Sequence, residues 1–321
     1  MIYEHNIKIL FFLNKNKTIG KIAHYILNIA YLPINLYLKF SPRPRPKKKY
    51  YFSICAIFKD EAVFFKEWIE YHKLIGVDHI YLYNNFSEDN YMTILQPYIS
   101  QGYVTLTDWP YMYSQIQAYE DCYHKYKNET FWLAFIDIDE FICPKYEYNI
   151  KDWIRQYEGY PAVAMYWQMF GTCGIMKQDL SRLVIEQFTT SWEKLNGTGK
   201  YILCTDKSFN INRIGVHFIF SRRKFLGVEI KIPMISEDHR FIFFPDLYLT
   251  PQNNTIQLNH YFSKSFENYY HKINKGEVAN KDNEAIRKNK IFFINHEKHN
   301  ISENRVIFRF LTLLKEQMQI D

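Results

Sequence analysis

Cysteine, glycine and proline are scarce in this 321-residue sequence, which holds 11 glycines and 11 prolines. Few residues are therefore available for low-complexity linkers, and no internal repeat has the period of a solenoid or propeller. No CxxC pair or Cys/His cluster has zinc-site spacing, so the cysteines predict unpaired thiols in a reducing compartment. A hydrophobic fraction of 47% predicts an ordinary globular protein with a buried core. The five cysteines are Cys55, Cys122, Cys143, Cys173 and Cys204.

Acidic residues are nearly absent from the first 50 positions, where Glu4 is the one acid among ten lysines and arginines. The remaining residues hold 30 basic and 33 acidic side chains, so the net charge of +6 comes from an N-terminal arm. Proteins that bind nucleic acid polymers spread basic residues through the fold. The near-neutral body excludes such a polymer as the expected partner.

No hydrophobic run is long enough to be a clear membrane span. Residues Ile22–Leu38 lack charge but include two asparagines, a histidine and a proline, and spanning helices need about 20 strongly apolar residues. A basic, proline-rich segment follows at 42–49, without a signal-peptide cleavage site. Three interpretations stay open: a helix lying on an anionic membrane surface, a helix packed on the domain, or a true span. In each, the body faces the cytosol, so a cytoplasmic, peripheral location is expected.

The body alternates apolar strands with helices. Strands are predicted at 50–57, 78–83, 103–107 and 131–136, and helices at 61–75, 92–100 and 114–127. This alternation indicates parallel βαβ units, whose ligands bind beyond the C-terminal strand ends. Polar clusters follow three of the strands, at 59–61, 84–89 and 137–140. These clusters define a candidate site on one rim of the sheet.

Asp137 and Asp139 follow the most hydrophobic strand in the chain. Two carboxylates one residue apart at a strand end can share a divalent cation, and hard oxygen ligands with open positions suit Mg²⁺ or Mn²⁺. The cation would neutralise charge on a diphosphate leaving group. A solvated turn is the alternative, because a DxD pair is common by chance.

Seven blocks, in order, resemble glycosyltransferase family 92 and its bacterial family-2-like relatives across roughly residues 53–277. They are AIFKDEAVFFKEWIEYHKLIGVDHIYLYNNFSED, LQPYISQGYVTL, QIQAYEDCYHKYKNETFWLAFIDIDEFICP, YWQMFGTCG, GKYILC, GVHF and LNHYFSKSFENYYHKINKG. The resemblance implies a GT-A fold, an α/β architecture with a Rossmann-like, mixed but mostly parallel sheet and flanking helices. It also implies inverting transfer of a hexose from a nucleotide-sugar, in the first place a UDP-sugar, to a glycan or glycolipid.

The resemblance assigns roles to individual residues. Asp137 and Asp139 match the metal-binding DxD, and His260 matches a third metal or diphosphate ligand. Lys275 stands where the family tends to have arginine, which weakens a bidentate phosphate contact there, although Lys264 and Lys272 could still supply charge. Nucleotide-sugar contacts are assigned to Lys59, Asp60, Glu61, Asp89, Gln117, Asp121 and Asp137.

The acceptor side is less defined by the sequence. Trp167 and Phe170 are candidates for an aromatic acceptor wall, with a place in the core as the alternative. An inverting transferase needs a general base. Glu186 and the pair Glu237–Asp238 are available, and Asp238 is the predicted catalytic residue. His217 is expected to be structural.

Three segments are predicted: a membrane-associating arm at 1–49, a transferase domain at 50–277 and a helical extension at 278–321. In the last part, basic amphipathic helices are expected at 271–290 and 302–317. A DxD phosphotransferase is a weaker alternative, because Phe141 stands where its signature needs Thr or Val. A non-catalytic, membrane-surface binding protein is the other alternative. The expected context is synthesis of a bacterial surface glycan such as lipopolysaccharide or capsule.

Overall fold

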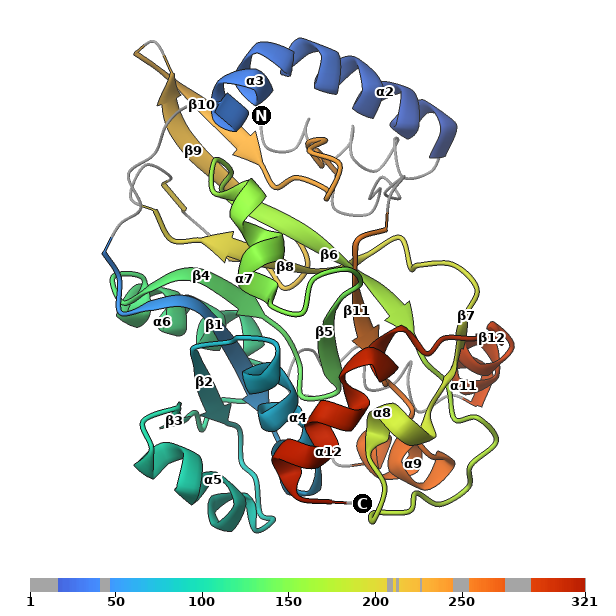
Figure 1. Cartoon of the computed structure of the whole chain (residues 1–321). Coiled ribbons are helices and arrows are strands. Elements are labelled where there is room, and N and C mark those ends of the chain that lie inside the picture. Colours follow the sequence, from blue (N-terminus) through green and yellow to red (C-terminus); the bar gives the residue numbers. More distant parts are fainter. Residues whose placement is uncertain are drawn as a thin grey trace.

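The computed structural model describes residues 17–40, 47–206, 210–211, 214–225, 227–244, 254–274 and 290–320. Its centre is an eight-stranded sheet with the strand order β3-β2-β1-β4-β8-β6-β11-β5 (Figure 1). Two small sheets pair β9 with β10 and β7 with β12. The strands are β1 (Tyr50–Phe58), β2 (His79–Asn84), β3 (Val104–Asp108), β4 (Thr130–Phe135), β5 (Glu140–Pro144), β6 (Ala162–Met169), β7 (Thr190–Trp192), β8 (Gly199–Cys204), β9 (Phe220–Phe225), β10 (Val228–Pro233), β11 (Ile256–His260) and β12 (Asn300–Glu303).

The helices cover both faces of this sheet and its ends. The described α-helices are α2 (Lys17–Ala30), α3 (Leu32–Phe40), α4 (Ala62–Leu74), α5 (Tyr91–Ser100), α6 (Gln115–Tyr126), α7 (Ile150–Ile154), α8 (Val184–Gln187), α9 (Phe266–Asn274), α11 (Lys290–Glu297) and α12 (Leu311–Met318). Two short 3₁₀ helices, η1 (Arg155–Tyr157) and η2 (Val306–Phe310), precede turns or helices.

The predicted strands and helices of the first half are confirmed to within one or two residues. β1 pairs in parallel with β2 and β4, and β2 pairs in parallel with β3. β1, β2 and β4 are nearly continuous apolar runs because both of their faces are buried, whereas β3, at the edge of the sheet, is half-buried. In β1, Ile54 packs into the core beneath α4 and α5, whereas its neighbour Cys55 packs into the core beneath α6.

The second half of the sheet is mixed. β8 is antiparallel to both β4 and β6, and β11 is parallel to β6 but antiparallel to β5. This arrangement sets His260 opposite Glu140 on one side and Met169 on the other. Strands remote in sequence therefore reach the loop that carries the DxD pair.

The N-terminal stretch predicted at 22–38 forms two helices, α2 and α3, that meet at Tyr31. Pro33 lies in the first turn of α3, where its missing N–H costs no helical hydrogen bond. Both helices pack against the segment 239–243 (Figure 1). Within the described residues, no helix combines the length and apolar character that a bilayer crossing needs.

The C-terminal residues 290–320 pack into the main core through Ile307, Phe310 and Leu314. The helix predicted to begin at Ser302 is wrong at its start. Ser302 lies in β12, which pairs with β7, and α12 begins at Leu311. Of the helix predicted at 271–290, α9 reaches Asn274, and the residues 275–289 lie outside the described part, as does the predicted boundary at 278. All five cysteines are free, as predicted.

Candidate active site

Asp137 lies in the loop after β4 and is held by three side chains. Its Oδ1 accepts hydrogen bonds from Gln115 Nε2 at 3.0 Å and from the Tyr119 hydroxyl at 3.2 Å, both on α6. Its Oδ2 lies 3.0 Å from Nζ of Lys200 on β8. Burial opposes ionisation of Asp137, but the Lys200 ammonium outweighs this effect and holds the carboxyl pKa below its ordinary value. Asp137 is therefore an anion at neutral pH.

Lys200 is a feature that the sequence analysis missed. Its side chain is 1% exposed, although β8 is otherwise an apolar strand. Burial alone would lower the pKa of the ammonium, but Asp137 and Glu140 raise it above its ordinary value. A lysine inside an apolar strand was the available signal, because a buried charge needs a partner.

Asp139 faces a second lysine and a histidine. Lys272 on α9 donates to Asp139 Oδ2, and Nε2 of His260 lies 3.4 Å from Oδ1. Burial is outweighed by Lys272 and His260, so the pKa of Asp139 falls well below its usual range. Burial in turn lowers the pKa of His260, so its ring is neutral at pH 7. Asp139 and His260 are thus buried side by side, and the half-buried Asp137 is close enough for the charges of both to affect its pKa.

Glu140 shapes the loop between these two aspartates. Its Oε2 accepts from the Asp137 backbone N–H at 2.9 Å, and its Oε1 accepts from Trp167 Nε1 at 2.6 Å. The side chain is fully buried, and burial raises its pKa well above the ordinary value. Nδ1 of His260 lies 3.9 Å from Oε1 and has no hydrogen-bond partner among the described residues. Glu140 and Trp167 therefore support the cluster from beneath.

The carboxylate oxygens of Asp137 and Asp139 suit a divalent cation that also binds a substrate phosphate. Among the described residues, no three His, Cys, Asp or Glu side chains are grouped as a complete protein metal site. Mg²⁺ and similar ions are commonly held by one or two carboxylates plus substrate phosphates, so two aspartates are enough. Each aspartate already has one lysine partner, which balances the two negative charges. A diphosphate entering this site would add negative charge that a cation offsets.

Hydrogen bonds connect the loops after β1 and β2. Asp60 adopts a φ of 51° and accepts from the Glu88 N–H at 2.8 Å, while its own N–H donates to Ser87 Oγ at 3.0 Å. Asp89 Oδ2 accepts from the Ala62 N–H at 2.7 Å, in the first turn of α4. Asp60 and Asp89 therefore hold these two loops together.

Lys264 connects the loop after β1 to the carboxylates. Its Nζ lies 4.0 Å from Glu61 Oε2 and 4.0 Å from the centre of the Phe64 ring. The same charge also lowers the pKa of Asp139, behind Lys272 and His260. Glu61 is thus linked to the cluster through a buried lysine, and the neighbouring Lys59 is half-buried.

Two residues on α6 that were predicted to bind the nucleotide-sugar lie apart from the cluster. Gln117 is exposed, and Asp121 bonds the Tyr83 hydroxyl at 2.7 Å and Lys125 at 2.9 Å. Gln115 takes the place predicted for Gln117, because two residues along a helix rotate a side chain to the opposite side. The correct signal was the helix start, where Gln115 points toward the adjacent strand end.

Asp238 does not lie with the carboxylate cluster. Its neighbour Ile235 bridges Val163 near the start of β6, whereas His260 pairs with Met169 at the end of that strand. Six residues of strand separate the two positions by roughly 20 Å. Asp238 accepts from Arg240 instead. The prediction of Asp238 as the general base is therefore not supported by its position.

Of the two aromatic residues predicted at the acceptor side, only Trp167 reaches the site. Its ring lies 4.9 Å from that of His260 and 5.1 Å from that of His217. Phe170 is 1% exposed and stacks on Tyr261 at 4.6 Å, so its assignment as an acceptor wall is corrected to a place in the core.

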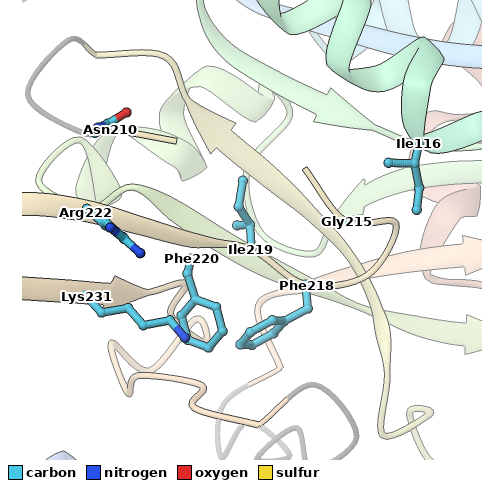
Figure 2. Close-up of a pocket in the computed structure, with 8 residues that line it drawn as sticks. All are labelled: Ile116, Asn210, Gly215, Phe218, Ile219, Phe220, Arg222 and Lys231. Carbon is cyan, nitrogen blue, oxygen red and sulfur yellow. The ribbon is translucent and has the colours of Figure 1, made fainter. Parts of the chain in front are cut away.

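A pocket of about 330 Å³ has Ile116 and Phe218 among its lining residues, which follow Gln115 and His217 in the sequence. Figure 2 shows Phe220 beside Phe218, with the Lys231 side chain reaching toward it. The two rings meet edge to face at 4.5 Å, and Lys231 Nζ lies 3.3 Å from the Phe220 ring centre. Aromatic faces beside a cation form a surface to which a sugar ring can bind.

The sequence profile of glycosyltransferase family 92 matches residues 48–303. The chain belongs to glycosyltransferase family 92. Its mixed α/β architecture, with a mostly parallel sheet between helices, is the predicted one.

Curated relatives cover only part of this family 92 chain. A glycosyltransferase family 92 protein of Oryza sativa subsp. japonica is 32% identical over 130 residues, which cover 38% of this chain and 22% of the relative. A galactan beta-1,4-galactosyltransferase of Arabidopsis thaliana is 30% identical over 105 residues, or 30% of this chain and 21% of the relative. The chain thus spans about a fifth of the length of these relatives.

Solved structures show weaker likeness. Residues 1–349 of TarS from S. aureus are 10% identical with a TM-score of 0.36, over 83% of this chain and 73% of that chain. A mannosyltransferase from Pyrobaculum calidifontis, in complex with GDP-Man and Mn²⁺, is 12% identical with a TM-score of 0.31, over 57% and 54% of the two chains. Likeness of this size does not define a donor or an acceptor.

Proposed function

We propose that this family 92 protein transfers a hexose from a nucleotide-sugar, in the first place a UDP-sugar, to a glycan or glycolipid acceptor. The observation that carries the proposal is the cluster of Asp137 and Asp139 with Lys200, Lys272 and His260 at one sheet edge. An acidic pair that served only as a solvated turn would not have a lysine partner for each carboxylate, with Asp139 buried. Inversion at the anomeric carbon rests on the family resemblance.

The charges of the cluster suit a diphosphate. Lys200 and Lys272 hold the aspartates as anions and keep two ammonium groups beside the position of the donor phosphates. When bound, Mn²⁺ or Mg²⁺ would be held by Asp137 and Asp139, with His260 nearby, and would neutralise charge developing on the leaving diphosphate. Glu140 keeps the loop in place through the Asp137 N–H, and Trp167 limits access of water to its carboxyl.

The acceptor is proposed to enter through the pocket of Phe218, Phe220 and Lys231. Phe218 follows His217, whose ring lies 5.1 Å from that of Trp167, and the aromatic faces of the pocket match the apolar face of a sugar ring. The galactosyltransferase named among the relatives makes UDP-galactose the first donor to test. A cytoplasmic location and a role in bacterial surface glycan synthesis stay predictions.

Hydrolysis of UDP-hexoses with Mn²⁺ in the absence of acceptor tests this proposal. The wild type is expected to release UDP slowly, and Asp139→Asn is expected to release almost none. Asp238→Asn is the matched control, because it makes the same chemical change away from the cluster and should retain release. Equal release from wild type and Asp139→Asn would contradict the assignment.

The alternative of a non-catalytic, membrane-surface binding protein is tested by the same assay. A degenerate transferase would neither bind nor hydrolyse any nucleotide-sugar from a panel of UDP- and GDP-sugars. The wild type is expected to gain thermal stability with at least one of them, since a ligand that binds the folded state raises the melting temperature.

A further inference from the structure

Helices α2 and α3 face the protein with their polar side chains. Asn28 Oδ1 accepts from the Phe241 N–H at 2.8 Å, and its Nδ2 donates to the Phe241 carbonyl at 3.0 Å. Asn35 Nδ2 donates to the His239 carbonyl at 2.8 Å. His24 is fully buried, and its Nε2 accepts from the Phe243 N–H at 3.0 Å. These side chains recur at intervals of four and seven residues, so they form one stripe that docks on the segment 239–243.

The opposite side of the same helices is apolar and exposed. We name as the outer face Ile22, Ile26, Ile29, Leu32, Leu36 and Phe40. Ile29 is 72% exposed and Phe40 is 71% exposed. Among the described residues, α2 and α3 together carry nine of the 25 exposed large hydrophobic side chains. An ordinary surface helix buries its apolar stripe and exposes its polar one, so this polarity is reversed.

The charged residues of α2 and α3 are all basic. Neither α2 nor α3 contains an acidic residue, and Lys21 and Lys39 are exposed. The first 50 residues carry ten basic side chains and one acid. Two copies of this face would bring like charges together, whereas an anionic lipid surface accepts both the apolar side chains and the lysines.

We propose that the outer face of α2 and α3 binds the surface of a bilayer that contains anionic phospholipid. The helices lie in the plane of the interface, because α2 has 14 residues and α3 has nine. The stripe of His24, Asn28 and Asn35 fixes this surface rigidly to the body. The proposal needs no donor, metal or catalysis, so it stands apart from the proposed transferase reaction.

The hairpin of β9 and β10 lies beside α3 (Figure 1), so the proposed orientation brings it close to the lipid. The Tyr31 hydroxyl of α2–α3 donates to the Lys231 carbonyl at 3.2 Å, and Arg223 lies 5.4 Å above the Tyr37 ring. Lys231 also lines the pocket of Phe218 and Phe220. An acceptor with a lipid tail could therefore reach the pocket without leaving the interface.

Co-sedimentation of the full chain with vesicles tests the proposal. Wild type is expected to bind phosphatidylcholine vesicles containing phosphatidylglycerol, more weakly at high salt and more weakly to phosphatidylcholine alone. The triple variant Ile22→Gln, Ile26→Gln, Ile29→Gln should bind at least about tenfold more weakly, because apolar burial drives interfacial binding. The matched control is Met176→Gln, Leu180→Gln, Ile301→Gln, which changes equally exposed side chains elsewhere and should bind as wild type does.

Thermal unfolding keeps the test interpretable, since the substituted side chains make few contacts and the triple variant should melt near the wild-type temperature. Lys21→Gln, Lys39→Gln offers a second route, and it should weaken binding to phosphatidylglycerol vesicles without changing stability. Wild-type protein that stays in the supernatant would overturn the proposal. So would wild-type-like binding by the folded triple variant, or a wild-type dimer in sedimentation velocity that the triple variant converts to monomer without any vesicle binding.

Discussion

Two acidic pairs lie at opposite ends of β6, and they differ in what faces them. Asp137 and Asp139 meet Lys200, Lys272 and His260, which come from three separate elements. Glu237 and Asp238 meet Thr255 and Arg240, and the Glu237 carboxylate accepts from the Thr255 N–H at 2.6 Å. The first pair gathers charges able to hold a diphosphate. The second ties a turn to the neighbouring strand.

The comparison shows that an acidic pair alone does not define a site. The deciding feature is the convergence of cations from distant strands and helices on one sheet edge. Substitutions that remove these partners should therefore affect activity at the first acidic pair and leave it unchanged at the second.

The largest difference is expected in transfer activity. Asp139→Asn should lower the turnover of UDP-hexose by about 100- to 1,000-fold, the usual cost of removing one preorganised electrostatic contact in an active site. The turnover of Asp238→Asn should stay within about threefold of wild type, because its carboxylate lies at the far end of β6. A threefold change corresponds to less than about 1 kcal/mol of activation free energy. Steady-state kinetics on both purified variants makes the comparison. A larger loss in Asp238→Asn would restore it as a candidate base.

The next effect is on both stability and activity. Lys200→Met should destabilise the fold by about 2 kcal/mol, because it leaves Asp137 and Glu140 without their buried cation. Combining it with Asp137→Asn should recover part of that free energy of unfolding, since the unpaired charge is gone, while activity stays low. Denaturant unfolding of both single variants and the double variant measures the coupling. Additive losses would show that Lys200 and Asp137 do not interact.

A smaller effect separates two glutamines on α6. Gln115→Leu should reduce turnover by about tenfold, since a hydrogen bond to a charged group contributes about 1.5–3 kcal/mol at most. Gln117→Leu is its matched control and should leave turnover unchanged, because Gln117 is exposed. The reverse order of effects would restore the original assignment of Gln117 to the donor site.

The smallest effect concerns pH and the second acidic pair. Burial lowers the pKa of His239 to about 4, so the unfolded chain binds its proton first as pH falls below about 6.5. The free energy of unfolding therefore falls as the pH is lowered from 6.5 to 4. Because His239 is only partly buried, solvent screening limits this loss to less than about 1 kcal/mol. His239→Gln should flatten the pH dependence of the free energy of unfolding in this range. An unchanged slope would show that His239 titrates normally.

The sequence predicted the parallel half of the fold well and the site only in part. β1 to β4 and the helices between them were predicted because apolar strands alternate with amphipathic helices. Asp137 and Asp139 followed from their place after β4. Lys200 and Gln115 were missed, because their partners depend on the register of β8 and on the rotation of α6, which local patterns do not specify. Asp238 could not be placed for the same reason, since sequence distance from the DxD pair does not show which end of β6 it occupies.

The N-terminal helices show a related limit. The apolar stretch 22–38 was visible in the sequence, but the polar contacts of His24, Asn28 and Asn35 with the segment 239–243 depend on tertiary structure. Without those contacts, the sequence could not show which side of α2 faces outward.

Thermal unfolding with UDP-galactose and Mn²⁺ tests the central claim most directly, with other UDP-hexoses beside it. The account predicts that at least one donor raises the melting temperature of wild type and of Asp238→Asn, and that the same donor has no effect on folded Asp139→Asn. An equal rise in Asp139→Asn, or a rise lost only in Asp238→Asn, would contradict it.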